Sequence, residues 1–176
     1  MPEPWRNPRP APQLQQVQPR ILKLPIFTWL WAWWPALLWA TVIFSMSTDR
    51  FSSEHTRSII EPILKWIYPA ITADQFEMIH HLIRKCAHFT EYFIFGLLLF
   101  RGIRRGRPGW RWSWGFGALF AAAIYSALDE IHQAFVASRT ASPYDSLLDS
   151  VGALAAMLVL FLWLRSRTPK PFAAAA

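Results

Sequence analysis

The sequence predicts an all-α, polytopic membrane protein with four transmembrane helices and an amphipathic helix in the first outer loop. Its apolar residues are grouped in runs of about 20, the length a helix needs to cross the hydrocarbon core of a bilayer. Hydrophobic residues make up 53% of the 176-residue chain, and aromatic residues make up 16%. The 18 lysines and arginines lie mostly at the ends of apolar runs, which favours orientation in a bilayer and excludes a nucleic-acid partner.

The chain divides into three parts. Residues 1–25 contain seven prolines and no apolar periodicity, so they are predicted to form a disordered cytoplasmic tail. Residues 26–164 are predicted to form the membrane domain, and residues 165–176 a short second cytoplasmic tail. The first tail is too long and too rich in proline for the start of a signal peptide, so the first apolar run is predicted to be an uncleaved anchor.

Four helical segments are predicted to cross the membrane, over residues 26–46, about 81–100, 112–136 and 145–164. Pro35 is expected to kink the first, because proline removes one backbone donor from a helix. The helix that contains the second is expected to begin at Asp74, whose carboxylate can cap the first amides. Residues 137–144, which include Pro143, are predicted to form a short turn before the last span.

An amphipathic helix is predicted between the first two spans, over residues 53–68. Isoleucines and Leu64 recur there at helical spacing, opposite Arg57, Glu61 and Lys65. Pro69 is expected to end this helix. We expect it to lie on the membrane surface or to cap the bundle.

The distribution of cations along the chain predicts its orientation. Lysine and arginine number four in the first tail, three in residues 47–72 with three acids, five in residues 101–111, one in residues 137–144, and three after the last span. Cytoplasmic segments carry the excess of these residues. Both termini are therefore predicted to be cytoplasmic, with the first and third connections outside.

Three polar blocks interrupt the apolar helices, at residues 85–92, 125–133 and 144–149. A charged side chain at the bilayer centre costs about 2.5 to 3.5 kcal/mol on insertion scales, so such groups usually mark a functional site. The predicted orientation places all three blocks in the outer half of the membrane, where they should face one another around a hydrated pocket. The candidate ligand-binding residues are Lys85, His88, Glu91, Tyr92, Tyr125, Asp129, Glu130, Gln133, Arg139, Asp145 and Asp149.

Three motifs carry a resemblance to a known family: K-x-x-H-F-x-x-Y-x-x-x-G, Y-S-x-x-D-E-x-x-Q and R-T-x-S-x-x-D, at residues 85–96, 125–133 and 139–145. The pattern resembles the VanZ-like membrane proteins, named for an accessory glycopeptide-resistance determinant of Gram-positive bacteria. It covers roughly residues 40–164. The resemblance implies a multi-pass protein of the bacterial plasma (inner) membrane that lowers susceptibility to teicoplanin-type antibiotics. The family usually has Asn where this chain has Asp149.

Three functions remain open from the sequence. The first is binding of a polar headgroup at the outer leaflet, with Lys85 and Arg139 pairing with its phosphate or carboxylate. Membrane lipids, a lipid-linked cell-wall intermediate and a lipophilic antibiotic are the expected partners. The second is an enzyme acting on such a headgroup. The third is a proton- or ion-coupled transporter subunit, for which a homo-oligomer would supply the missing repeat.

The enzyme alternative would use a histidine, His88 or His132, as general base. Its cation ligands would be carboxylates drawn from Asp129, Glu130, Asp145 and Asp149. Because the chain has no nucleophile motif and no established metal signature, we expect no cofactor and assign no metal ligand. The structural alternative is an ion-pair network that only fixes helix register, although apolar replacements often stabilise a protein as well as such networks do.

Overall fold

The computed structural model describes residues 25–48, 53–136 and 142–167. These residues form five helices and no strand: α1 (Pro25–Met46), α2 (Ser53–Ile67), α3 (Ala73–Arg104), α4 (Trp112–Gln133) and α5 (Pro143–Ser166). The predicted all-α class is confirmed for this part of the chain. Both predicted tails lie almost wholly outside the described residues, and so does Arg139.

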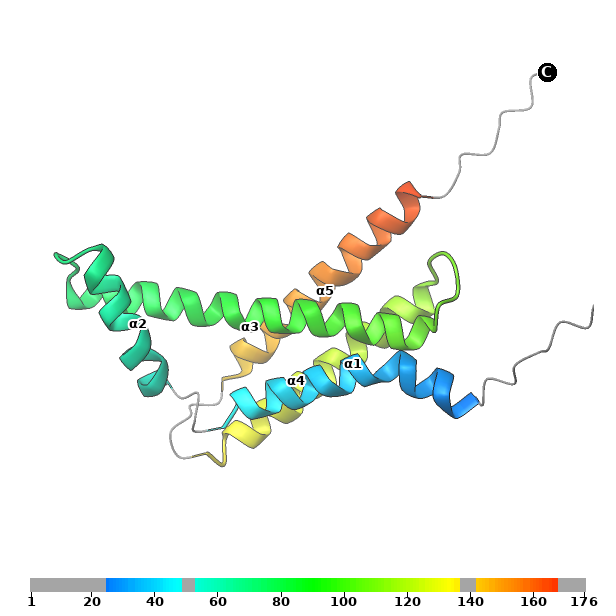
Figure 1. The fold of residues 1–176 in the computed structure, drawn as a ribbon, viewed down its shortest axis with the longest axis horizontal. Helices are drawn as coiled ribbons and strands as arrows, with labels where there is room; N and C mark the ends of the chain where they lie inside the picture. The colour runs from blue at the N-terminus through cyan, green and yellow to red at the C-terminus, as the bar shows by residue number, and fades with distance from the viewer. Residues whose placement is uncertain (1–24, 49–52, 137–141, 168–176) are drawn as a thin grey trace, which may run out of the picture.

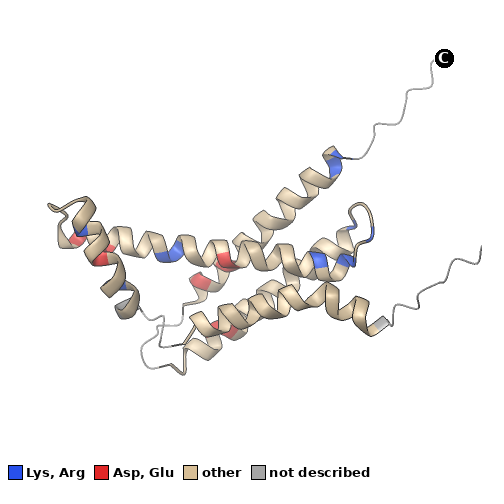
Figure 2. Cartoon of the chain, in the orientation of Figure 1, with Lys and Arg blue, Asp and Glu red and all other residues tan. Residues whose placement is uncertain are grey.

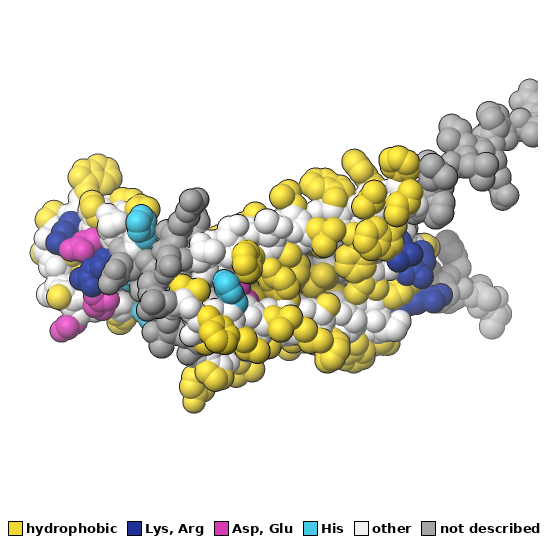
Figure 3. All heavy atoms as spheres, turned by 90° about the horizontal axis from the view of Figure 1, so that it is seen from below, with side chains coloured by type: hydrophobic (Ala, Val, Ile, Leu, Met, Phe, Trp, Pro, Cys, Tyr) yellow, Lys and Arg dark blue, Asp and Glu magenta, His cyan; other side chains and the backbone are white. Residues whose placement is uncertain are grey.

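Three of the helices, α1, α3 and α5, are long and apolar enough to cross a membrane. α4 is 22 residues long, but tryptophans, glycines and the polar residues near its end dilute its apolar character. Figure 3 shows hydrophobic side chains covering the middle of one face, with charged groups gathered toward its two ends. This distribution is typical of a protein with an apolar belt inside a bilayer.

α3 is the central helix, because it contacts each of the other four (Figure 1). Its most extensive packing is against α5. Glycines permit this approach: a Cβ at Gly96 would lie 3.2 Å from the Cα of Ala153, and one at Gly152 would overlap the carbonyl oxygen of Phe89. Small residues on both helices therefore allow α3 and α5 to pack closely.

The helix boundaries differ from the prediction at several ends. α3 begins with a capping box, in which Thr72 Oγ1 accepts from the Gln75 amide at 3.3 Å and Gln75 Oε1 accepts from the Thr72 amide at 3.1 Å. Asp74 is therefore not the cap but a first-turn acid. α5 begins at Pro143, which was expected in a turn, because the fixed φ of proline suits a first helical position.

Two further ends were misplaced. α4 ends at Gln133 rather than Val136. α3 continues to Arg104, so Arg101 belongs to a helix and not to the cationic loop. The helix stops where Arg105 takes a left-handed φ of 50°, followed by Gly106 at 73°.

α1 contains Pro35 and is bent along its length in Figure 1. Proline has no amide to donate to the carbonyl four residues earlier, which belongs to Trp31. The guanidinium of Arg101, on α3, donates to that carbonyl at 3.2 Å and to the Ala32 carbonyl at 2.9 Å. A cation near the end of α3 therefore supplies what the proline removes from α1.

α2 is attached to the start of α3 through Arg57. Its guanidinium donates to Glu77 on α3 at 2.5 Å and to Glu61 on α2 at 3.3 Å, and Lys65 donates to the other Glu61 oxygen at 2.7 Å. The large apolar side chains Ile59, Ile63, Trp66 and Ile67 of α2 remain exposed. Figure 1 shows α2 lying apart from the long axis of the bundle.

Candidate functional site

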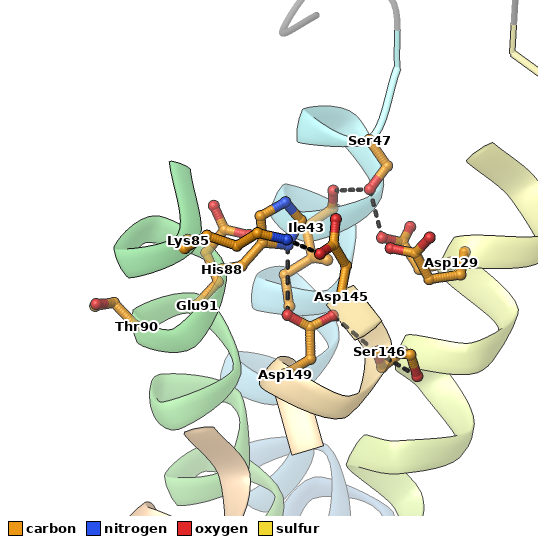
Figure 4. A network of polar contacts seen from close by, with 12 residues as sticks. Ile43, Ser47, Lys85, His88, Thr90, Glu91, Asp129, Asp145, Ser146 and Asp149 are labelled. Atoms are coloured by element: carbon orange, nitrogen blue, oxygen red, sulfur yellow. Dashed lines mark hydrogen bonds and ion pairs between the residues drawn. The ribbon is translucent and has the colours of Figure 1, made fainter. Parts of the chain in front are cut away.

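The outermost polar contact of the predicted site joins Lys85 on α3 to Asp145 on α5 (Figure 4). The first turn of α5 holds Asp145, where the positive end of the helix dipole also favours a carboxylate. The two side chains are 31% and 16% exposed, so the pair is only partly removed from solvent. The predicted meeting of the first and third polar blocks is present in the structure.

A second contact lies one turn further along both helices. His88 Nδ1 of α3 lies 3.4 Å from Asp149 Oδ1 of α5, and the Asp149 side chain is only 2% exposed. The other Asp149 oxygen accepts a hydrogen bond from Ser126 of α4 at 2.8 Å, and Ser126 also contacts the Ser146 hydroxyl at 3.0 Å. Asp149 thus brings α3, α4 and α5 together at one point.

A third contact joins α1 to α4. Asp129 Oδ2 accepts from the Ser47 hydroxyl at 2.6 Å and from the Gln133 amide at 3.0 Å. Its Oδ1 is buried and has no hydrogen-bond partner among the described residues. Both donors are neutral, so the local contacts solvate the carboxylate without placing a cation on it.

Three candidate residues serve packing rather than an open pocket. Tyr125 donates its hydroxyl to the Ala40 carbonyl of α1 at 2.6 Å. Glu130 accepts at 2.7 Å from the backbone amide of Ser142, which holds the start of α5. Tyr92 is fully buried, with its ring against Phe95.

The cavity beside this network measures about 100 Å³. It lies among α1, α2, α3 and α4 and is lined by Met46, Ser47, Thr56, Arg84, Ala87, His88, Glu91 and Gln133. Three predicted residues, His88, Glu91 and Gln133, therefore reach it, whereas Lys85 and Asp145 pair outside its lining. Arg84 makes no hydrogen bond or ion pair with another described side chain, and it supplies the cavity with a cation.

Four residues of the site were missed by the sequence analysis: Ser47, Arg84, Ser126 and Ser146. The sequence could have identified Ser126 as a site residue. It lies three residues before Asp129 and seven before Gln133, so the three share one helical stripe. The buried face of α4 follows this stripe. His132 lies off it and packs against Phe44 of α1, with the two rings tilted and their centroids 4.8 Å apart.

The arrangement is suited to binding a polar group. No set of three or more His, Cys, Asp or Glu side chains in the described segments is placed to hold a metal ion. Instead, the acids are distributed: Asp145 is paired with Lys85, Asp149 with His88 and Ser126, and Asp129 with neutral donors. The cavity brings a guanidinium, an imidazole, a carboxylate, an amide and a hydroxyl to one space.

Comparison with known proteins identifies the family. A search of curated proteins and a search of solved structures found no match. The VanZ/LLP1 family model matches residues 31–164, which run from within α1 to near the end of α5 and include every described polar contact of the site. By this match over most of its length, the chain belongs to the VanZ/LLP1 family.

Proposed function

We propose that this VanZ/LLP1 membrane protein binds the polar headgroup of a lipid-linked or lipophilic ligand at the outer face of a bacterial plasma membrane. The observation that supports this proposal is a cavity lined by Arg84, His88 and Glu91, which lies directly beside the charged pairs that join α3 to α5. Charged groups in membrane-spanning helices are expensive and are usually retained for function. A network that only fixed helix register would not need an open space lined by a cation and an acid.

The proposed orientation has four spans, cytoplasmic termini and α2 on the outer surface. α4 has 22 residues and is therefore about 33 Å long, which is enough to cross a bilayer. Figure 2 shows Lys and Arg without acidic residues at the end where α3, the following loop and α5 end, whereas the other half of the bundle mixes basic and acidic residues. The positive-inside rule assigns the basic end to the cytoplasm. The exposed isoleucines of α2 support a surface position.

The chemistry of the cavity predicts the character of the headgroup. Arg84 suits a phosphate or carboxylate, since a guanidinium binds both in a bidentate manner. Glu91 and Gln133 suit hydroxyl, amide or ammonium donors on the same ligand. Lys85 is already neutralised by Asp145, so its proposed role is to position α5 and not to meet the ligand first. Arg139 lies outside the described residues and stays a candidate second cation on the sequence alone.

Two ligand sources share this chemistry: a lipid-linked cell-wall intermediate and a lipophilic glycopeptide antibiotic. Either has polar groups at the level of the outer leaflet and a chain that stays in the membrane. Binding of either at this site would change how much antibiotic reaches its target. We therefore propose an effect on glycopeptide susceptibility, as the family resemblance implies.

The test compares cavity variants with a matched control in a susceptible Gram-positive host. Expression of the chain is expected to reduce teicoplanin susceptibility and the binding of fluorescent teicoplanin to cells. Arg84→Gln and Glu91→Gln are expected to remove both effects at unchanged membrane levels. Lys65→Gln removes a charge on α2 and should change neither, because the ion pair of Lys65 among the described residues is with Glu61 of the same helix and lies outside the cavity. Full activity of both cavity variants would overturn the proposal.

The two sources are separated by a binding assay in nanodiscs. A fluorescent lipid-linked wall precursor and fluorescent teicoplanin are titrated separately onto the purified protein. Saturable binding of one ligand, lost with Arg84→Gln, identifies the source. Absence of saturable binding for both ligands would contradict headgroup binding.

One observation favours the enzyme alternative. His88 lies 3.4 Å from Asp149, and a carboxylate beside an imidazole can orient a general base. Turnover of the lipid-linked precursor by the purified protein, lost with His88→Gln while precursor binding persists, would establish catalysis.

A further inference from the structure

A second cavity lies at the opposite end of α4 and α5 from the polar site. It measures about 180 Å³ and is lined only by apolar residues and one glycine: Trp110, Trp112, Gly115, Phe116, Leu119, Leu154, Met157, Leu158 and Phe161. The lining runs from Trp112 to Leu119 on α4 and from Leu154 to Phe161 on α5. Each stretch covers eight residues, so this α4–α5 groove is roughly 10 Å long. Leu119 and Asp129 are ten residues apart on α4, which separates the groove from the polar site by about 15 Å.

The groove is open to the surroundings along its length. Phe116, Leu154 and Leu158 are each more than half exposed, at 63%, 51% and 57%. In a membrane such a hollow is filled by an acyl chain, because apolar surface of this kind has no favourable contact with water. At its end, Trp110 and Trp112 both pack against Phe161, with ring centroids 5.5 and 5.2 Å apart. Aromatic rings of this type belong at the headgroup level of a bilayer.

Arginines gather at this same end. Arg111 lies between the two groove-lining tryptophans in sequence, and its guanidinium lies 5.2 Å from the Trp114 ring. The Arg107 guanidinium lies 4.6 Å from the same ring. Trp114 is buried and does not line the groove, so it holds both cations beside the end of the groove. On α5, the Arg165 guanidinium lies 5.9 Å from Phe161, which lines the groove. The basic end of the bundle in Figure 2 therefore coincides with the end of an apolar groove.

We infer that the α4–α5 groove is a binding site for an anionic phospholipid of the leaflet at the arginine-rich end, with an acyl chain between the helices and the phosphate at Arg111 and Arg165. Charge complementarity selects this occupant. Basic groups at the membrane surface attract anionic lipids, and pockets between helices that combine basic and apolar groups bind their headgroups. A lipid without net charge could also fill the groove, but its headgroup would be attracted less strongly by the arginines.

The test is native mass spectrometry of the detergent-purified full chain, titrated with phosphatidylglycerol or phosphatidylcholine of identical acyl chains. The wild-type protein is expected to bind phosphatidylglycerol more tightly. The double variant Arg111→Gln/Arg165→Gln is expected to lose about 30-fold in phosphatidylglycerol affinity. This is the combined effect of removing two cations that each attract an anionic lipid at the membrane surface. Its affinity for phosphatidylcholine should change little. The Arg111→Lys/Arg165→Lys variant keeps both charges and should retain most of the preference.

The groove itself is tested by filling it. Leu154→Trp replaces a leucine of the lining by a larger indole side chain, which should fill the groove and weaken binding of both lipids. Leu162→Trp is the matched control, because Leu162 is similarly exposed on α5, at 57%, but does not line the groove. Equal affinity of the wild-type protein for the two lipids would overturn the inference. So would unchanged binding in Leu154→Trp, or a lipid-free dimer that only Leu154→Trp dissociates, since the occupant would then be a second copy of the chain.

Discussion

The guanidinium of Arg101 replaces the backbone amide that Pro35 lacks. Pro35 leaves the carbonyl of Trp31 without its helical partner, and Arg101 donates to this carbonyl across the α1–α3 interface at 3.2 Å. An unsatisfied carbonyl is costly in hydrocarbon, where no water replaces the lost bond. The arginine therefore makes a proline tolerable inside a candidate membrane span.

Replacing Arg101 by leucine is expected to lower the free energy of unfolding by about 1 to 3 kcal/mol, since the carbonyls of Trp31 and Ala32 lose a charged donor where hydrocarbon offers no water in its place. In a Pro35→Ala background the same change should cost less, because the amide of residue 35 then donates to Trp31. Unfolding of the four proteins in mixed micelles measures the coupling. Equal losses in both backgrounds would show that the two residues act independently.

Loss of Lys85 is expected to destabilise the protein through the carboxylate it leaves behind. Lys85→Met should lower the free energy of unfolding by about 1 to 3 kcal/mol, less than for a fully buried pair because both side chains are partly exposed. Adding Asp145→Asn should recover most of the loss. Lys65→Met, which breaks an exposed pair with Glu61, is the control and should cost at most about 1 kcal/mol. A double variant less stable than Lys85→Met would contradict this account.

A side chain at Gly152 is expected to force α3 and α5 apart. Gly152→Val should cost about 3 kcal/mol or more, because the added carbon meets the rigid backbone of Phe89. Gly117→Ala provides the comparison, since a Cβ there would meet only the Cδ1 atom of Ile103 at 3.4 Å, an ordinary contact. Thermal aggregation of the purified variants reports the difference. Equal stability of the two variants would refute the close packing.

The helical structure of α2 is expected to loosen in acid, because both ion-pair partners of Glu61 lie on the same helix. Hydrogen bonds from Lys65 and from Arg57 hold the pKa of Glu61 below its ordinary value. A carboxyl whose pKa is lowered on folding stabilises the folded state above its unfolded pKa, and this contribution is lost as the pH falls through the folded pKa. Amide exchange in α2, corrected for its intrinsic pH dependence, should therefore accelerate at a pH below the ordinary glutamate range. Arg57→Gln should raise exchange at neutral pH and flatten this dependence.

The sequence predicted the helices and the meeting of their polar blocks because both follow from strong signals. A long uncharged run such as that of α1 is expected to form a membrane helix, because only a helix satisfies its own backbone in hydrocarbon. Charged residues inside such helices, such as Lys85 and Asp145, are expected to pair with one another. The capping box of α3 was also within reach, since Thr72 and Gln75 are three residues apart in the usual pattern. Asp74 was chosen instead because a carboxylate is an equally common cap.

The composition of the cavity was harder to predict. Helical periodicity places residues on a face, but it does not say which neighbouring helix that face meets. Tyr125 was therefore assigned to the site, although it bonds to Ala40 of α1. Ser47 and Arg84 lie near helix ends or between motifs, and only the packing of α1 and α2 against α3 brings them to the cavity.

The contact between Gly152 and the backbone of Phe89 would limit how the proposed ligand could enter. Two helices that touch through their main chains form a rigid wall, so α3 and α5 have no slack to open between them. The polar cavity instead borders Met46 of α1 and Thr56 of α2. The proposed headgroup would therefore have to enter on the side of the bundle formed by α1 and α2, while the contact between α3 and α5 stays fixed.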